Sequence, residues 1–321
     1  MPWLHRYAKL VAASTVLLIA AGGMVTSTGS GLSVPDWPNT YGQFMFLFPM
    51  DRWVGGIFYE HSHRLIASTV GFLTVILAVW TWRVEPRRWV RNIAFAALGA
   101  VILQGLLGGL TVLLFLPPPV SIAHAGLAQL FFCLTLSLVV FTSPRWRNAE
   151  NVADDRTLRG RAIAATAMIY LQILLGATMR HTGSGLAIPS FPLAFGHLIP
   201  PIWSGPIAIH FAHRIWALAV FGAILMTTSR VWTVHPHRPE LKRPSLLLLI
   251  LVCAQIALGG IVVLSGLQPF LNTLHVVNGA LILGTSLVLT LRTLRPIMDR
   301  VPARGDRHAA PARATPLGAR S

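Results

Sequence analysis

Eight long apolar runs follow one another along the chain and are separated by shorter polar segments. A helix needs roughly 20 residues to cross the hydrocarbon core of a membrane, and each run is about that long. The pattern therefore predicts an all-α polytopic membrane protein with eight transmembrane helices. The runs cover residues 8–27, 64–82, 93–116, 121–142, 161–180, 207–229, 245–266 and 270–291.

The second half of the chain repeats motifs of the first half in the same order. Residues 22–32 and 176–186 end the first and fifth runs with similar glycine-rich sequences. The offset between matching motifs stays near 150 residues, which indicates an internal repeat. The further matches are His63-Arg64 with His213-Arg214, Gln104 with Gln255, 107–109 with 258–260, and His124 with His275.

The repeat predicts how the helices are grouped. Each copy contains four spans, so both copies have the same orientation and are related by an axis along the membrane normal. We expect two tandem four-helix bundles, one over residues 1–150 and one over residues 151–298. Residues 299–321 are rich in Ala, Arg, Gly and Pro, and we expect a disordered cytoplasmic tail there.

The formal net charge of +16 follows the predicted topology. Basic residues lie before the first span or after an even-numbered span, whereas the opposite loops hold Arg52 alone. By the positive-inside rule both termini are cytoplasmic in a multi-pass protein of the cell membrane. This placement argues against a nucleic-acid partner. The basic residues are Arg6, Lys9, Arg83, Arg87, Arg88, Arg91, Arg145, Arg147, Arg156, Arg159, Arg161, Arg230, Arg238, Lys242, Arg243 and the arginines from Arg292 to Arg320.

The stretch from Tyr59 to Arg64 places titratable groups at the edge of the second span. Glu60 and His63 are three positions apart, so they lie on one face if the segment is helical. Ionisable residues at such positions face a bundle interior or a water-filled site. The alternative is an interfacial cluster that only marks the start of a helix.

Four histidines occupy matched positions within the first turns of the even-numbered spans. They form one pair per repeat, His63 with His124 and His213 with His275. A single histidine there would more often be a core residue, but two imidazoles from neighbouring helices can be the axial ligands of a haem. Zinc is disfavoured because each half offers two histidines and no cysteine at that depth.

Other polar positions refine this interpretation. Arg64 and Arg214 follow a paired histidine and could contact haem propionates, or extend to the membrane interface instead. Glu60 corresponds to His210, which indicates proton chemistry in the N-terminal half only. We interpret the glycine pairs as helix packing. The same interpretation is preferred for three glutamines inside the spans, Gln104, Gln172 and Gln255.

With these residues, the chain resembles the haem A synthase family over all eight spans. The motifs that carry the resemblance are residues 28–31, 35–38 and 60–64 and the four paired histidines. The resemblance implies oxidation of the C8 methyl group of haem O to the formyl group of haem A, with water as the oxygen source. It also implies that His63 and His124 ligate the substrate haem in the N-terminal half, that His213 and His275 ligate a cofactor haem b, and that Glu60 is catalytic.

One departure from the family pattern concerns cysteine. Many bacterial members carry a cysteine pair in the first outer loop, whereas this chain has no cysteine between residues 28 and 58. The electron route is therefore open. A di-haem b-type cytochrome for quinol-linked electron transfer is the alternative function, and haem transport is a third. Membrane lipid, haem O synthase, the assembly of a terminal oxidase and a second copy of the chain are the expected partners.

Overall fold

The computed structural model describes residues 2–147 and 154–298, and this part of the chain is helical without a strand. Eight helices in it are long and apolar enough to cross a membrane, as predicted. These eight are α1 (Pro2–Ser27), α2 (Gly56–Val84), α3 (Arg88–Leu113), α4 (Pro118–Thr142), α6 (Arg156–His181), α7 (Gly205–Val234), α8 (Pro239–Leu264) and α9 (Pro269–Met298). The short helix α5 (Pro144–Arg147) and the 3₁₀ turns η1 (Met45–Leu47), η2 (Met50–Arg52) and η3 (Ser184–Leu186) lie between them.

The helices extend beyond the apolar runs, and this matters most at α2. The run begins at residue 64, but the helix begins at Gly56. Glu60 and His63 therefore lie inside the helix and on one face of it. The tail at residues 299–321, for which disorder was predicted, lies outside the described residues.

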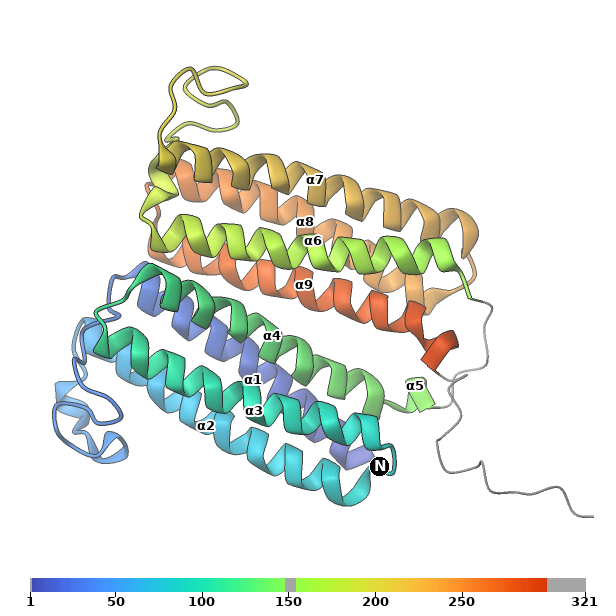
Figure 1. Ribbon diagram of the computed structural model, residues 1–321, viewed down its shortest axis with the longest axis horizontal. Helices are drawn as coiled ribbons and strands as arrows, with labels where there is room; N and C mark the ends of the chain where they lie inside the picture. The colour runs from blue at the N-terminus through green and yellow to red at the C-terminus, as the bar shows by residue number, and fades with distance from the viewer. Residues whose placement is uncertain (1, 148–153, 299–321) are drawn as a thin grey trace, which may run out of the picture.

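Two groups of four helices pack side by side (Figure 1). In the first group α1 contacts α2, α2 contacts α3, α3 contacts α4, and α4 returns to α1. The second group repeats this ring with α6, α7, α8 and α9. In each ring the first and third helices are diagonal to one another, and so are the second and fourth. The expected rotation axis between the groups stays a prediction.

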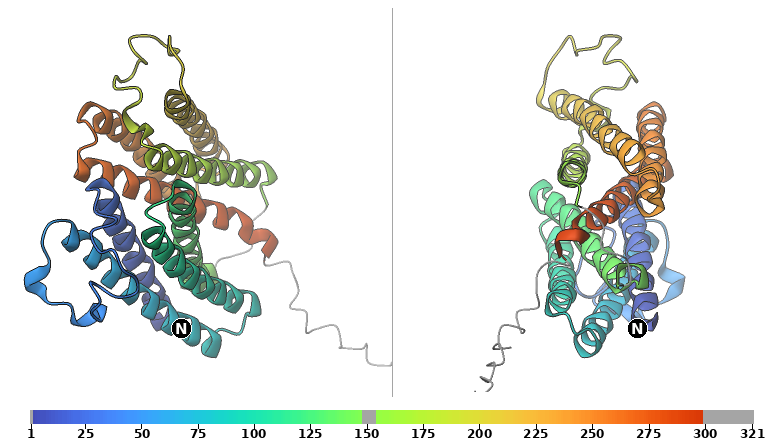
Figure 2. Two further views of the ribbon diagram at one scale, coloured as in Figure 1. Left: turned by 60° about the vertical axis from the view of Figure 1, so that its left-hand side comes forward. Right: turned by 90° about the vertical axis from the view of Figure 1, so that its right-hand side faces the viewer.

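The two groups meet through α1, α4, α6 and α9 (Figure 2). Small residues permit this contact. A Cβ atom added at Gly284 of α9 would lie 2.9 Å from Phe132 of α4, and one at Gly126 of α4 would lie 2.8 Å from Leu174 of α6. Close approach at glycine is the usual device of helix interfaces in membranes, where burial of apolar surface gives little driving force.

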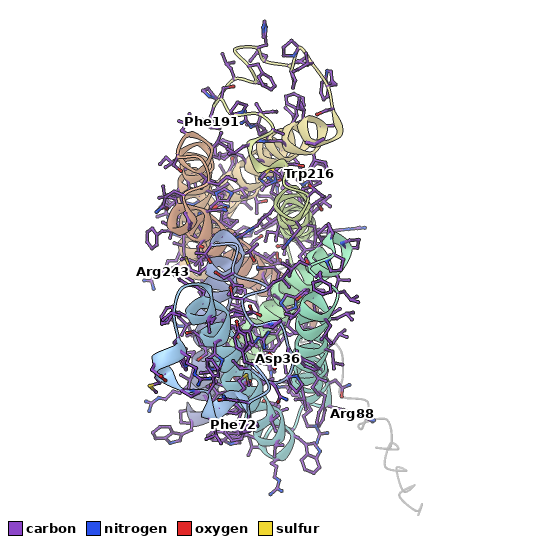
Figure 3. The ribbon with its side chains drawn as sticks, turned by 90° about the vertical axis from the view of Figure 1, so that its left-hand side faces the viewer. Asp36, Phe72, Arg88, Phe191, Trp216 and Arg243 are labelled. Carbon is purple, nitrogen blue, oxygen red and sulfur yellow. The ribbon has the colours of Figure 1, made fainter. Side chains whose placement is uncertain are left out.

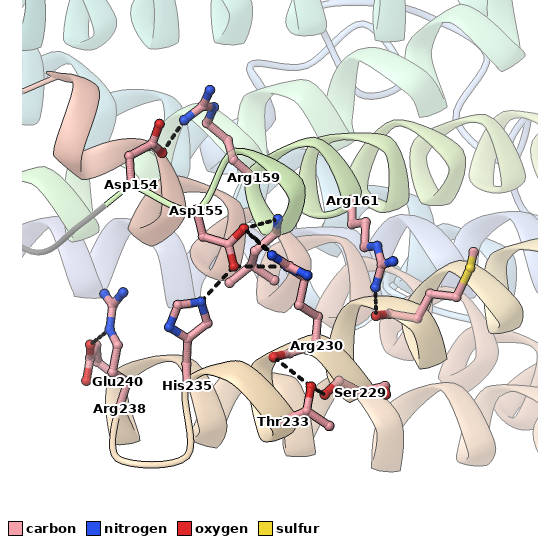
Figure 4. A network of polar contacts seen from close by, with 12 residues as sticks. Asp154, Asp155, Arg159, Arg161, Ser229, Arg230, Thr233, His235, Arg238 and Glu240 are labelled. Atoms are coloured by element: carbon pink, nitrogen blue, oxygen red, sulfur yellow. Dashed lines mark hydrogen bonds and ion pairs between the residues drawn. The ribbon is translucent and has the colours of Figure 1, made fainter.

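Ion pairs hold the helix ends on the side of the N-terminus. Glu85, directly after α2, pairs with Arg87 at 2.7 Å and with Arg147 at 2.6 Å. Burial alone would raise the pKa of Glu85, but the hydrogen bonds and charges of the two arginines lower it below its ordinary value. In the second group Asp155 caps α6 by accepting from the Leu158 N–H, and it pairs with Arg230 (Figure 4).

Two long loops, residues 28–55 and 182–204, lie at the opposite end and face the viewer in Figure 3. Asp36 organises the first loop, since its carboxylate accepts from the N–H groups of Tyr41 at 2.8 Å and Gly42 at 2.7 Å. Burial would raise the pKa of Asp36, yet these hydrogen bonds lower it. The loop is therefore an ordered cover over the ends of α1 and α2.

Candidate functional site

Glu60 is buried at the outer end of α2, with 3% of its surface exposed. One carboxylate oxygen accepts from the Val34 N–H at 2.8 Å, and the other accepts from Arg64 at 2.7 Å. A buried carboxylate is costly unless it is paired and hydrogen-bonded, and Glu60 is both. The contact between Glu60 and Arg64 is direct and joins neighbouring turns of α2.

Arg64 ties the first outer loop to α2. Besides Glu60, its guanidinium donates to three loop carbonyls, at 2.7 to 2.9 Å. The planar fork of donors in arginine suits such a set of fixed acceptors. The three carbonyls belong to Val34, Asp36 and Asn39.

The second group makes the same loop contacts with different chemistry. The Ile188 N–H donates to His210 Nδ1 at 3.3 Å, where the first group uses Glu60. Arg214 donates to the carbonyls of Ile188 and Ser190, but no carboxylate within the described residues pairs with it. Its Nη1 atom is buried without a hydrogen-bond partner there. The second group therefore holds a cation with unused donor capacity.

Each predicted histidine pair lies on the diagonal of its ring. His63 is on α2 and His124 is on α4, and the two imidazoles interact electrostatically. His213 on α7 and His275 on α9 interact in the same way. The sequence analysis expected neighbouring helices, whereas the two helices of each pair are diagonal and face one another across the interior of the ring.

A glycine on the neighbouring helix faces each of the four imidazoles. A Cβ atom at Gly22 of α1 would lie 3.0 Å from the His63 ring, and one at Gly176 of α6 would lie 3.1 Å from the His213 ring. The corresponding distances are 3.1 Å for Gly108 against His124 and 3.2 Å for Gly259 against His275. The glycines thus make room for flat rings beside a helix backbone. Helix packing, the sequence interpretation, is only part of their role.

Three glutamines contact the paired histidines rather than serving packing alone. Gln104 donates to the His124 carbonyl and Gln255 to the His275 carbonyl, both at 3.0 Å. Gln172 donates to the His213 carbonyl at 2.9 Å and also approaches both ring nitrogens. No glutamine in the described part of the chain bonds to His63, and Leu18 occupies the position that matches Gln172. These bonds fix the backbone of the helix segments that carry the three histidines.

The residues present fit ligation of a haem iron by two imidazoles. The Nδ1 atoms of His63, His124 and His275 are buried and have no hydrogen-bond partner among the described residues. Buried polar atoms without partners are rare in folded proteins, and a functional role or a bound ion, ligand or water is the usual explanation. The described residues contain no group of three or more His, Cys, Asp or Glu that could hold a metal ion. Two-imidazole sites are thus the available ligand sets.

Sequence reasoning missed two histidines near these pairs, one buried and one half-buried. His61 is fully buried between Phe48 and Trp53, and its Nδ1 lies 3.1 Å from Thr40 Oγ1. His181 ends α6 and interacts electrostatically with His124. The sequence did contain a signal for a polar site at this end of α6. Arg180, the neighbour of His181, is a cation at the position where the first repeat has Thr26.

The geometry defines a polytopic helical membrane protein with two inward-facing histidine pairs. Its sequence matches the family described as COX15-CtaA, cytochrome oxidase assembly protein, over residues 5–287. The chain belongs to this family.

Three relatives are each called heme A synthase. The protein from Symbiobacterium thermophilum is 32% identical over 277 residues, which cover 83% of this chain and 88% of the relative. The one from Halalkalibacterium halodurans is 30% identical over 281 residues, covering 85% and 92%. The one from Geobacillus kaustophilus is 28% identical over 324 residues, covering 96% and 97%. The similarity therefore extends over most of this sequence and of each relative.

Proposed function

We propose that this chain is a haem A synthase, which oxidises the C8 methyl group of haem O to a formyl group within the membrane. The observation that carries the proposal is the pair of glycine-backed histidine sites, one in each ring of helices. Relatives that bear the name heme A synthase over most of the chain support it. A plain di-haem cytochrome is disfavoured, because it gives no reason for the relatives' shared name or for a carboxylate in one half only.

The two histidine pairs have different roles in this proposal. His63 and His124 hold the substrate haem O, and His213 and His275 hold haem b as the cofactor. Haem b supplies one-electron redox chemistry when it is bound. The glycines behind the rings set the position of each imidazole, and Gln104, Gln172 and Gln255 fix three of the four backbone segments that carry them.

The reaction requires a proton acceptor. Conversion of the methyl group and one water to the formyl group releases four electrons and four protons, and the oxygen of the aldehyde comes from the water. Glu60 is the carboxylate on the same face of α2 as His63, one turn away. As a general base it accepts a proton from the attacking water, a role that contributes roughly 10²- to 10⁴-fold to a rate. Arg64 and the Val34 N–H hold the carboxylate in place.

The two arginines suit haem propionates to different degrees. The Arg64 guanidinium already donates to three carbonyls and to Glu60. Arg214 keeps a buried Nη1 without a protein partner in the described chain, so it is the better candidate for a propionate. A charged carboxylate would satisfy this donor with a strong hydrogen bond.

The orientation in the membrane is part of the proposal. Both termini lie on the cytoplasmic side of the cell membrane, because the basic residues gather at that end of the helices. A reporter fused at Gly196 is expected to label outside and one fused at Pro236 inside. The opposite labelling would reverse the topology. Haem O synthase and a terminal oxidase under assembly are the expected partners on this pathway.

The substitution Glu60→Gln tests the catalytic role. The amide keeps the size and can still accept from the Val34 N–H, but it has no charge and is a poor base. The variant is expected to bind both haems and to accumulate haem O or a partly oxidised haem, measured by chromatography of extracted haem. Glu85→Gln, which alters a buried carboxylate at the opposite end, is the matched control and should still make haem A. Normal haem A yields from Glu60→Gln would rule out the role.

A further inference from the structure

A cavity outside the histidine sites lies on the basic side of the molecule. It has a volume of about 560 Å³ and is lined by residues of the short helix α5, the start of α8 and the end of α9. Trp146 of α5 and Leu291 of α9 belong to one buried cluster, which holds α5 against the end of α9. The cavity is thus a fixed feature at the junction of the two groups of helices.

The lining of the cavity is divided by chemistry. Arg145, Arg243 and Arg292 supply three cationic groups, whereas Pro244, Leu247 and Val288 supply an apolar wall. Leu247 and Val288 lie farther from their helix ends than Arg243 and Arg292, so the apolar wall is on the side of the membrane interior. A charged rim above an apolar wall matches the two parts of a phospholipid.

The described lining of the cavity holds three arginines and one carboxylate, and this carboxylate also attracts Arg292. Glu240 is the one acidic residue of the lining, and its carboxylate already accepts from Arg238 at 2.7 Å (Figure 4). Arg292 donates to the Glu240 carbonyl and interacts electrostatically with Arg145. Arg145 and Arg243 make no side-chain hydrogen bond or ion pair within the described residues. Two free guanidinium groups beside a third cation favour an anion between them.

We propose that this cavity binds the phosphate headgroup of an anionic phospholipid, with an acyl chain against Leu247 and Val288. Basic pockets between transmembrane helices on the cytoplasmic side are sites of this type. The lipid would join α5 of the first half to α8 and α9 of the second half. The site is separate from the histidine pairs, which lie toward the opposite ends of the helices.

The test uses the purified full-length chain after removal of bound lipid. Thermal unfolding and native mass spectrometry are followed during titration with phosphatidylglycerol, with phosphatidylcholine and with inorganic phosphate. The wild-type chain is expected to retain phosphatidylglycerol and to be stabilised by it, and by neither of the other two. A phosphatidylcholine effect of equal size, or an equal effect of inorganic phosphate alone, would overturn the lipid assignment.

The double variant Arg145→Gln with Arg243→Gln removes the two lining arginines for which the described residues provide no hydrogen bond or ion pair. Each basic residue near an anionic membrane surface contributes about a fivefold change in affinity, so the dissociation constant for phosphatidylglycerol should rise about 25-fold. The matched control is Arg88→Gln with Arg91→Gln, which removes two charges at the start of α3, on the same side of the membrane as the cavity. Equal weakening in both double variants would mean a general charge effect and would overturn the site. Unfolding in neutral lipid should be the same for both variants.

Discussion

The two halves of this protein close their outer loops with the same backbone contacts but with different side chains. In the first half a loop N–H donates to Glu60, and in the second half it donates to His210. Arg64 and Arg214 then donate to carbonyls of the same loops. The second half shows that a neutral acceptor is sufficient for this loop closure. The carboxylate in the first half therefore adds a charge and a proton acceptor that the fold itself does not require.

The difference extends to the neighbouring arginines. Glu60 compensates the charge of Arg64, while no described carboxylate pairs with Arg214. The charge of Arg64 in the first half is thus neutralised within the protein, whereas Arg214 in the second half can bind an external anion. This division agrees with a reaction site in one half and a resident haem in the other.

The largest expected effect distinguishes the histidine pairs. If the proposed assignment holds, His275→Ala removes one imidazole from haem b, and the low-spin absorption of the purified protein should be lost or become high-spin. His124→Ala should keep the haem b spectrum and lose haem A formation. Both variants remove an imidazole that a glycine backs, which makes them a matched pair. Identical spectra for the two would contradict the division of roles.

The next effect concerns the stability of the two loop closures. Arg64→Gln leaves the Glu60 carboxylate buried without its cation, and this should cost about 3–5 kcal/mol of unfolding free energy. Arg214→Gln removes two hydrogen bonds to carbonyls and should cost about 1–3 kcal/mol. Thermal or denaturant unfolding in detergent measures both values.

A third variant checks the origin of that cost. Adding Glu60→Gln to Arg64→Gln removes the stranded charge and should recover part of the lost stability. The two residues would be independent if their separate losses of unfolding free energy added up in the double variant. The direct contact at 2.7 Å would then contribute nothing.

The smallest effect concerns the glutamine that the second half has and the first half lacks. Gln172→Leu gives α6 the residue type that Leu18 provides in α1. Loss of the bond to the His213 carbonyl should speed the transfer of haem b to a scavenging apoprotein by about tenfold, the lower end of the effect of an outer-shell partner. Gln104→Leu, in the first half, is the matched control and should leave that rate unchanged.

Much of this architecture could be predicted from the sequence. Hydrophobic run length gave eight spans, and the ordered repeat of motifs brought His63 and His124, and His213 and His275, onto facing helices. The start of α2 was predicted eight residues late, because polar residues at a helix end interrupt an apolar run without ending the helix.

The close contacts within the site could not be predicted from the sequence. A glycine in an apolar span is equally consistent with helix packing and with a position facing a ring, so the role of Gly22 and Gly176 required the structure. His61 is polar, but the folded loop buries its ring between Phe48 and Trp53. Sequence spacing specifies the face of a helix, and it does not specify which loop folds over that face.

Two adjacent glycines of α1 serve different halves of the molecule. Gly22 faces the ring of His63, while a Cβ atom at Gly23 would lie 3.0 Å from Thr273, two residues before His275 on α9. Arg180 of α6 donates to the Gly23 carbonyl and to Ser27, so α1 is also bound to the second half by hydrogen bonds. Helix α1 therefore contacts the histidine sites of both groups of helices. A displacement of α1 that admitted a large ligand to the first site would also disturb the second site, so movement of α2 and α3 is the expected route of entry.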